Sequence, residues 1–306
     1  MVAYLVRRVA QGMLVLLGIS LIVFIALHLT GDPAAAMLRG GTPTRADILA
    51  LRRQLGLDQP LLAQYLIFLA NAVRGNLGTS YYYQAPALSL VFQHLPATIA
   101  LTAASMVVSL LIAFPLGILS ALRRNSLLDF VARVFALLGV SFPNFWLGIM
   151  LILIFAVRLN WLPPSGAGGP QYLILPALTL GMILAGITTR LVRSSVLDVT
   201  GADYVRTARA KGLPPSRLVL RHVVRNALLP VVTYIGLQFG TLLGGAVIIE
   251  QVFSWPGVGQ LALSAVNQGD YPLVQASVLV LATFLIFVNI LVDISYAFID
   301  PRIHYA

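Results

Sequence analysis

The one lysine of the chain, Lys211, is where nucleotide chemistry would have to begin. A phosphate-binding loop of the form GxxxxGK[ST] needs a lysine that is followed by a hydroxyl residue, whereas Lys211 is followed by Gly212 and Leu213. The motifs HExxH and GxSxG, which serve metal-assisted and serine-based hydrolysis, are also missing. We therefore identify no catalytic residue, and we expect a protein that is not an enzyme.

Metal and thiol chemistry find no support either. The chain has no cysteine, which excludes disulfides, thiolate nucleophiles and cysteine-based metal sites. The four histidines, which show no metal-ligand spacing, are His28, His94, His222 and His304. We expect no metal site and no cofactor on this chain.

The most informative part of the chain is the stretch 198–230, which reads DVTGADYVRTARAKGLPPSRLVLRHVVRNALLP. Residues 202–211 are mostly good helix formers, and Gly212 is placed to end that helix as a C′ glycine with positive φ. Pro214 and Pro215 can then start another helix, because proline is tolerated in a first turn. The pattern predicts a short helix, a turn, and a second helix that leads into an apolar segment.

Two interpretations of the helix at 202–211 remain open at this point. Tyr204, Ala208 and Lys211 share one face by their i, i+4, i+7 spacing. A rigid helix tied to two membrane helices would act as a lever, because a partner that moved it would also move the membrane helices. The alternative is an anchor whose basic side chains lie on anionic lipid headgroups.

The composition indicates a membrane protein. Of the 306 residues, 59% are hydrophobic and 10% are charged, and the mean hydropathy is +0.91, whereas a soluble domain carries about 25% charged residues. A transmembrane helix needs about 20 mostly apolar residues. The stretches that qualify are roughly 9–29, 97–122, 130–157, 172–189, 227–250 and 272–299. We therefore predict an all-α membrane protein with six transmembrane helices.

The positions of the basic residues predict the orientation in the membrane. The net charge of +10 could suggest nucleic acid, but the basic residues gather before the first apolar stretch, in the second loop and in the fourth loop. Basic residues in short loops stay on the cytoplasmic side, so both termini are predicted to be cytoplasmic and no nucleic acid is expected. The first loop, 30–95, is long enough to be translocated whatever its charge. The apolar run 9–29 is too long for a signal peptide, and we expect it to be retained as a helix.

The first loop is expected to form a small helical cap outside the membrane. Thr44 and Asp47 can form a capping box before a short helix that Gly56 ends. A second helix would run from Pro60 to Gly75, and its apolar part is too short to span the bilayer. The predicted domains are an N-terminal transmembrane helix at 1–29, the helical loop at 30–95, and a core at 96–300 that contains the short helix at about 201–212.

Small residues and prolines mark several of the predicted transmembrane helices. Residues spaced by four form two stripes of small side chains: Ala177, Gly181 and Ala185, and Gly236, Gly240 and Gly244. Such stripes serve either a subunit interface or pathway wall, or packing within one bundle. Pro115 and Pro143 are expected to kink their helices.

Polar residues inside the predicted helices are few. Asn144, Gln238 and Asn289 could line a wet pathway, or they could form hydrogen bonds between helices. The ionisable residues His28, Glu250 and Asp293 lie near helix ends. A proton- or sodium-coupled carrier would bury acids near the midplane, so their scarcity argues that the energy for transport comes from elsewhere.

The stretch 198–230 resembles the cytoplasmic signature of ABC importer permeases, which is EAA-x3-G followed by a hydrophobic residue, any residue and Leu-Pro. Residues 206–208 stand at the EAA positions, Gly212 is the glycine, and Pro230 closes the motif. An arginine in place of the glutamate and the longer spacing to Pro230 depart from the general pattern, and both resemble the dipeptide, oligopeptide and nickel importers. Stretches that resemble the same branch are GDP at 31–33, LGLDQPLLAQY at 55–65, GNLGTS at 75–80, HLPATIAL at 94–101, SFPNFWLG at 141–148, EQVFSWPGVGQL at 250–261 and IDPRIHY at 299–305.

This resemblance implies a B-type permease subunit with a type I (MetI-like) importer fold in a bacterial inner membrane. The implied partners are a C-type permease subunit as the other half of a heterodimer, two ATP-binding subunits and a periplasmic solute-binding protein. ATP and magnesium would bind the ATPase subunits. The residues implied to couple to those subunits are Asp203, Tyr204, Arg206, Thr207, Ala208, Lys211 and Gly212.

The implied cargo is a dipeptide or oligopeptide, or a related small solute such as a nickel chelate or glutathione. The alternative class is a stand-alone secondary transporter or channel, which the scarcity of acids near the midplane opposes. The two classes differ in one requirement, because only the importer needs ATPase subunits that bind the loop 198–226.

Overall fold

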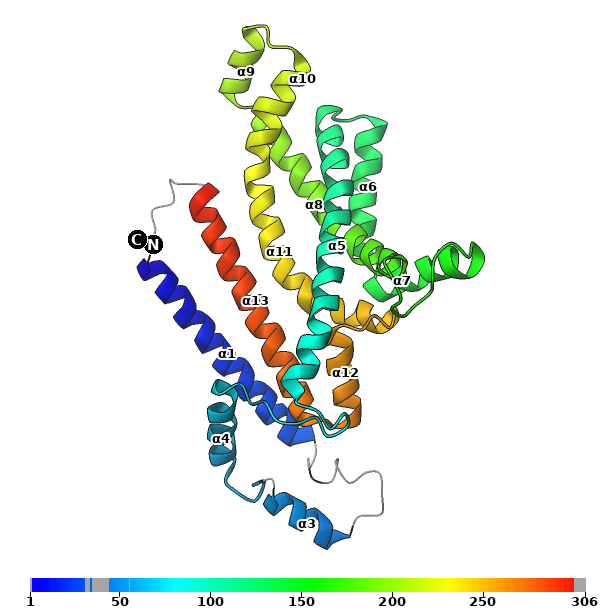
Figure 1. The fold of residues 1–306 in the computed structure, drawn as a ribbon. Helices are drawn as coiled ribbons and strands as arrows, with labels where there is room; N and C mark the ends of the chain where they lie inside the picture. Colours follow the sequence, from blue (N-terminus) through cyan, green and yellow to red (C-terminus); the bar gives the residue numbers. More distant parts are fainter. Residues whose placement is uncertain (1, 31–33, 35–43, 55, 300–306) are drawn as a thin grey trace. The chain divides into compact units, whose positions relative to one another are not determined.

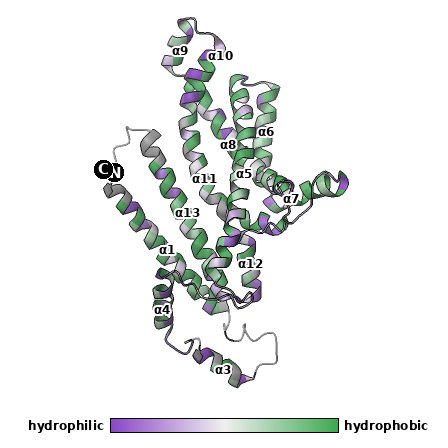
Figure 2. Ribbon diagram, viewed as in Figure 1, coloured by the Kyte–Doolittle hydropathy of each residue, from purple (hydrophilic) through white to green (hydrophobic). Residues whose placement is uncertain are grey.

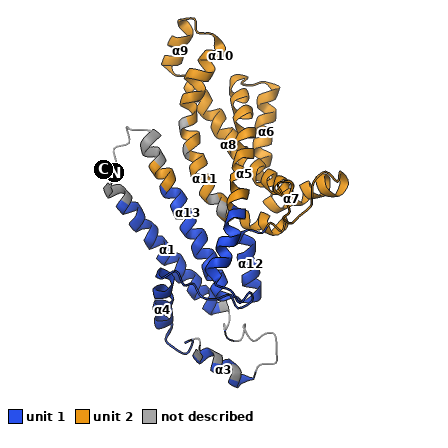
Figure 3. Cartoon of the chain, in the orientation of Figure 1, with its two compact units in different colours: residues 1–98, 256–290, 305 blue, residues 99–255, 291–304, 306 orange. Residues whose placement is uncertain are grey.

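The computed structural model describes residues 2–30, 34, 44–54 and 56–299, and these are mostly helical (Figure 1). The motif predicted at 31–33 and all but the first residue of the motif at 299–305 lie outside the described residues. The chain divides into a first unit of residues 1–98 and 256–290 and a second unit of residues 99–255 and 291–304 (Figure 3). Two helices, α5 (Ala87–Leu122) and α13 (Tyr271–Ile299), contribute to both units.

The described residues contain four helices that are each long and apolar enough to cross a membrane. They are α1 (Val2–Thr30), α5, α8 (Gln171–Thr200) and α13. Two bent pairs of helices qualify if each pair is one span, so the described part holds four to six candidate spans. Hydrophobic residues predominate along these helices (Figure 2), and each of the six predicted stretches falls on one of them.

The predicted stretch 130–157, with its expected kink at Pro143, holds two helices because the segment is broken in the middle. Helix α6 (Leu127–Ser141) ends before Pro143, and α7 (Asn144–Leu151) runs on into the π-helix η1 (Ile152–Arg158) after a bend of 107°. A proline lacks a backbone N–H and forces the residue before it out of the helical region. Phe142 accordingly has φ −87° and ψ 136°, so the kink expected at Pro143 is a full break.

The predicted end of the fourth apolar stretch at residue 189 is wrong. Helix α8 continues to Thr200, so Arg190 and Arg193 lie on a helix rather than in a loop. Apolar residues continue at helical spacing beyond Arg190, and Val192 and Val196 are buried. Their burial favours continuation of the helix in spite of the neighbouring charges. Helix α5 likewise starts earlier than predicted and runs through Pro115 without a break.

The first unit contains the helices predicted in the first loop. These are α3 (Arg45–Gln54) and α4 (Leu61–Val73). Its buried core joins the start of α5 to α12 (Val258–Gln268) and α13, and consists of Ala87, Val91, Val258, Leu261, Ala265, Leu273, Val274 and Ala276. Helix α12 was not predicted, although its buried residues recur at the i, i+3 and i+7 positions of an amphipathic helix.

In the second unit, α8 packs closely on α5 and α6 through small residues. A side chain added at Gly181 would lie 2.6 Å from Val108 Cγ1 of α5, and one added at Gly186 would lie 2.9 Å from the Ala136 carbonyl oxygen of α6. At Gly181 the Val108 side chain fills the space that a Cβ would take, and at Gly186 the backbones of α8 and α6 are in near contact. The stripe of small residues on α8 therefore serves packing within the chain.

The second stripe of small residues, on α11 (Arg225–Val252), has two different environments. A side chain added at Gly236 would lie 2.6 Å from Val292 Cγ1, so this glycine serves packing within the chain. Gly244 faces open space, with no atom within 4 Å of an added Cβ. Of the two interpretations of this stripe, packing within the chain thus holds at Gly236, and the surface at Gly244 remains available for another molecule.

Candidate functional site

The predicted short helix between the fourth and fifth apolar stretches is α9 (Asp203–Ala210). It ends in a Schellman motif, in which the Gly212 N–H donates to the Arg209 carbonyl at 3.0 Å and the Leu213 N–H donates to the Ala208 carbonyl at 3.4 Å. Gly212 has a φ of 76°, a left-handed conformation that residues with a Cβ rarely adopt. The predicted positive φ at Gly212 is thus confirmed.

One face of α9 is fixed to the second unit by a buried valine. Val205 is fully buried in what we call the loop cluster, which consists of Ala121, Val192, Val196, Val205, Leu218, Val223, Ala227 and Val231. These residues come from α5, α8, α9, the π-helix η2 (Leu218–Val224) and α11. Burial of one valine contributes about 1.5–3 kcal/mol, which helps to order a helix of 8 residues that would not be stable alone. Val205 thereby ties α9 to the ends of α8 and α11.

The opposite face of α9 is exposed and mostly polar. The side chains of Asp203 and Arg206 are 97% and 74% exposed, and their ion pair at 3.7 Å contributes little because it is solvated. Tyr204 is also exposed. Exposed basic side chains that follow in the same loop are Arg209, Lys211, Arg217, Arg221 and Arg225. An exposed aromatic ring on a short helix that also carries exposed arginines is a surface suited to a protein partner.

The face predicted to hold Tyr204, Ala208 and Lys211 is not uniformly accessible. Ala208 is half-buried against the loop cluster, whereas Tyr204 is exposed and Lys211 forms the exposed C-cap. Thr207, also exposed, donates its hydroxyl to the Asp203 carbonyl at 3.0 Å within the helix. A charge at Ala208 would disturb the loop cluster itself, so Tyr204 is the better residue with which to probe a docking partner.

The three residues proposed to line a pathway are not brought together in one described cavity. Asn144, at the start of α7, and Gln238 and Asn289 are each half-buried. Cavities of about 540 and 640 Å³ lie in the first unit beside α4, and none of the three residues lines them. His28 and Gln64, joined at 3.1 Å, line the smaller of the two. Among the described residues, no three His, Asp or Glu side chains come together in a group that could hold a metal ion.

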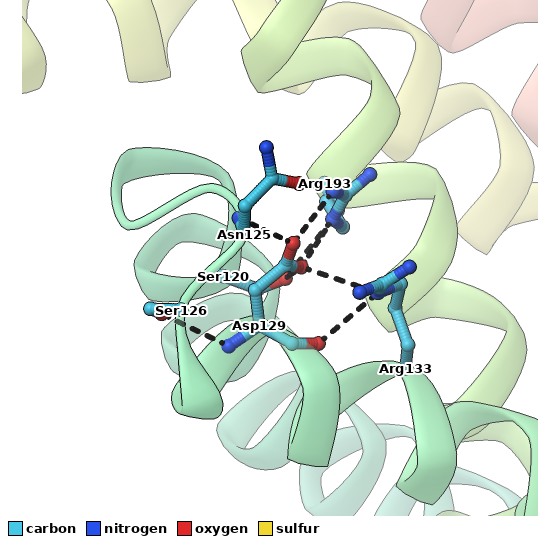
Figure 4. Close-up of polar contacts among 6 residues, drawn as sticks. All are labelled: Ser120, Asn125, Ser126, Asp129, Arg133 and Arg193. Carbon is cyan, nitrogen blue, oxygen red and sulfur yellow. Dashed lines mark hydrogen bonds and ion pairs between the residues drawn. The ribbon is translucent and has the colours of Figure 1, made fainter.

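The second unit also contains a buried ion pair that the sequence reasoning missed (Figure 4). Asp129 of α6 is fully buried, and Arg193 of α8 contacts both of its carboxylate oxygens, at 2.7 and 3.0 Å. The sequence does not reveal this pair, because the charge at Arg193 indicates a loop rather than the helix on which it lies. The available signal was Ser126, three residues before Asp129 and ahead of an apolar run; its hydroxyl accepts a hydrogen bond from the Asp129 N–H at 3.3 Å.

Two family models match the chain and together cover most of it. The model described as "Binding-protein-dependent transport system inner membrane component" matches residues 113–305. A second model, described as the N-terminal part of the membrane component of such transport systems, matches residues 1–102. The residues that form α9 and the loop cluster lie within the first match.

Curated relatives align with the chain from end to end. The glutathione transport system permease protein GsiC of Escherichia coli K12 is 43% identical over 307 aligned positions, which cover 100% of both chains. GsiC of Salmonella typhi matches to the same extent.

Solved structures share the fold at low sequence identity. A chain of the inward-facing MetNI methionine ABC transporter has a TM-score of 0.54 and 22% identity, covering 71% of this chain and 97% of that chain. A chain of an amino acid ABC transporter with histidines has a TM-score of 0.52 and 14% identity, covering 70% and 94%. The likeness to the methionine transporter shows that the chain has the all-helical MetI-like fold.

Proposed function

This chain belongs to the family of binding-protein-dependent transport system inner membrane components, and we propose that it is the B-type permease subunit of an ATP-driven importer. In this role it crosses a bacterial inner membrane and forms part of the pathway for the solute. It does not hydrolyse ATP itself; ATP and magnesium bind two separate ATPase subunits. A C-type permease completes the heterodimer, and a periplasmic solute-binding protein delivers the cargo.

The observation that carries the coupling role is the way α9 is held. Its inner face is anchored through Val205 to the loop cluster, while Tyr204 and Arg206 face outward. A docking residue on a freely moving loop would transmit little force. Here a push on Tyr204 reaches Val205 within one turn of helix and then α8 and α11 through the loop cluster.

The proposed contact with the ATPase subunit is a pocket that receives the Tyr204 ring. Large aromatic side chains in fully desolvated pockets are the residues that contribute most to protein interfaces. Asp203, Arg206, Thr207 and Lys211 then form a polar rim around the ring. ATP binding closes the two ATPase subunits and moves α9, and the membrane helices turn the cavity outward to receive the solute from the binding protein.

We propose a membrane arrangement with six spans, in which each of the two bent pairs is one span. Residues 1–29 form the first span, residues 30–95 form a helical insertion on the periplasmic side, and residues 96–300 form the core. Both termini and α9 lie in the cytoplasm. Support comes from the distribution of arginine, because basic residues in short loops mark the cytoplasmic side.

The proposed cargo is a small peptide or a peptide-like solute such as glutathione. The support is the end-to-end similarity to permeases named for glutathione transport. The cargo need not touch α9, so this part of the proposal is tested separately from the coupling role. Proteoliposomes that contain the assembled importer should take up labelled glutathione only when the binding protein and ATP are both present, and an excess of unlabelled dipeptide tests how narrow the selectivity is.

The coupling role is tested by a pull-down of the ATPase subunits with the membrane subunits. Tyr204→Ala should reduce recovery of the ATPases at least about tenfold, because loss of a buried aromatic anchor costs about 2 kcal/mol or more. Tyr82→Ala is the matched control, since Tyr82 is an exposed tyrosine on the proposed periplasmic side. Full recovery of the ATPases with both Tyr204→Ala and Tyr204→Glu would contradict the docking role. Uptake driven by an ion gradient without ATPases would instead support a secondary carrier.

A further inference from the structure

The Asp129 carboxylate is a buried charge that accepts four hydrogen bonds, and the exposed Arg133 lies 3.7 Å from its Oδ1 (Figure 4). Its Oδ1 accepts the Ser120 hydroxyl at 2.6 Å and Arg193 Nε at 2.7 Å. Its Oδ2 accepts Arg193 Nη2 at 3.0 Å and the Asn125 N–H at 3.0 Å. The arginine thus binds both oxygens at once, which fixes the angle between the two side chains as well as their distance.

These contacts join three helices at one point. Ser120 lies in the last turn of α5, Asn125 in the turn that follows, Asp129 in the first turn of α6, and Arg193 on α8. The neighbouring approach of α5 to α8 is close, because a side chain added at Gly117 would lie 2.7 Å from the Val192 side chain and 2.9 Å from the backbone carbonyl oxygen of Thr189, and would clash with both. The ion pair and this close contact together prevent α8 from sliding along α5 and α6.

The ion pair also lies next to the anchor of α9. Val192 and Val196 flank Arg193 on α8, and both belong to the loop cluster that buries Val205. A force applied to α9 therefore reaches α8 at the turn that Arg193 holds. If that turn were free, α8 could bend or rotate locally and absorb the movement.

We propose that Asp129 and Arg193 are positioning residues that join α5, α6 and α8 into one rigid body, so that a displacement of α9 reaches the membrane-spanning part without loss. The rigidity of this body follows from the second unit alone. Its use in transport rests on the proposed function, in which ATPase subunits move α9.

The energetics of buried ion pairs separate this role from simple stabilisation. Replacement of both members of such a pair by apolar residues of similar size is often neutral or stabilising, whereas removal of one member leaves an unpaired buried charge and is strongly destabilising. The double variant Asp129→Leu/Arg193→Met should therefore remain folded while it loses the fixed geometry. A role in positioning, unlike a role in stability, is lost in that double variant.

The rigid body can be observed by distance measurements between spin labels, for which a cysteine-free chain is well suited. Cysteines replace Arg124, in the turn after α5, and Ala210, at the end of α9, which are both exposed. In the otherwise unchanged chain, we expect a narrow distance distribution that keeps the same mean with and without ATP in the assembled importer. In the double variant, we expect a broader distribution, and a mean that changes when ATP is added.

The functional readout is the amount of solute transported per ATP hydrolysed. We expect this ratio to fall at least about tenfold in the double variant while the rate of ATP hydrolysis stays within about twofold. A merely unstable protein would lower the transport rate and the hydrolysis rate in proportion and leave their ratio unchanged. Arg193→Lys keeps the charge but cannot bind both oxygens, so its ratio of solute transported per ATP should lie between those of the unmodified chain and the double variant. Arg190→Met is the matched control, because it removes an exposed arginine from the same helix.

The outcomes are distinguishable. A folded double variant with an unchanged distance distribution and an unchanged transport ratio would overturn the proposal. If the double variant does not fold, Arg193→Lys and Asp129→Asn decide by the same two measurements. If the unmodified chain recruits no ATPases, the proposed function fails, and the width of the distribution in the isolated chain still tests the rigid body.

Discussion

The Ser80 hydroxyl donates a hydrogen bond to the Asp270 carboxylate, and so joins two residues that lie 190 positions apart in the chain. Both side chains are buried. The same carboxylate accepts the Tyr82 N–H and the Leu273 N–H, each at 3.3 Å, so it fixes the loop at residues 80–83 to the first turn of α13. This one side chain holds the end of the first predicted loop against the first unit's core.

Asp270→Ala should destabilise the first unit markedly. The change leaves the Ser80 hydroxyl and two backbone N–H groups without their acceptor in a buried place, at about 1–3 kcal/mol for each group that water cannot reach. We expect the midpoint of thermal unfolding to fall by several degrees, measured in nanodiscs by the fluorescence of a dye that does not react with thiols. Asp58→Ala is the control because Asp58 is exposed. Equal midpoints for the two variants would show that the contact contributes nothing.

Tyr81 predicts a loss of stability at high pH. Burial, followed in importance by the nearby Asp270 carboxylate and by Tyr271, raises the pKa of the Tyr81 phenol to about 12 from 10.0. A group whose pKa is raised by folding contributes its full stabilisation below the unfolded value and loses it as pH rises from about 10 to 12. Tyr81→Phe cannot ionise, so its midpoint should fall less over this range than that of the unmodified chain. Tyr83→Phe, at an exposed position, should behave like the unmodified chain. An equal fall of the midpoint in all three proteins would show that ionisation of Tyr81 does not cause the loss of stability.

Gly212→Val should uncouple transport while the chain still inserts and folds. A β-branched residue with a φ of 76° strains the Schellman turn by about 1–2 kcal/mol, which α9 relieves by tilting away from its native position. We expect normal amounts in the membrane, weak attachment of the ATPases and poor uptake. Gly201→Ala is the matched control, because Gly201 has φ −78° and ψ −14°, which alanine adopts freely. Full uptake by Gly212→Val would remove the argument.

The membrane orientation predicts opposite labelling of two introduced cysteines. Ser80 is 1% exposed and unsuitable as a labelling site, but the adjacent segment offers Tyr82, which is 64% exposed. Cysteine at Tyr82 should react in intact cells with an impermeant thiol reagent, and cysteine at the exposed Ser216 should react only after the cells are opened. Labelling of position 216 from outside would reverse the proposed orientation.

Local patterns in the sequence predicted much of the fold. The apolar stretches, the helices α3 and α4 in the first loop, and the positive φ of Gly212 depend on residues that are close in the chain. The end of α8 was missed because charge at Arg190 and Arg193 indicates a helix end, whereas burial of the loop cluster decides the matter. Tertiary packing overrides a local signal of this kind.

The buried contacts could not be predicted, because they depend on pairs of residues that are distant in the chain. Asp129 and Arg193 are 64 positions apart, and their contact exists only because α8 continues past residue 189 and packs on α6 without a side-chain cushion. A single sequence shows neither the continuation nor the close packing. For the same reason, helical spacing places Ala208 on one face with Tyr204 but does not show that the loop cluster half-buries it.

The unbroken length of α8 bears on where α9 lies relative to the bilayer. Its 30 residues extend about 45 Å at 1.5 Å per residue, whereas the hydrocarbon core is about 30 Å thick. A tilt of about 20° shortens the projection by only a few ångströms. If the outer end of α8 lies at the membrane boundary, its other end extends about 10–15 Å beyond the opposite boundary. In that arrangement α9 lies beyond the headgroups on the cytoplasmic side and does not rest on them. This position is within reach of a soluble ATPase subunit and weighs against the lipid-anchor interpretation.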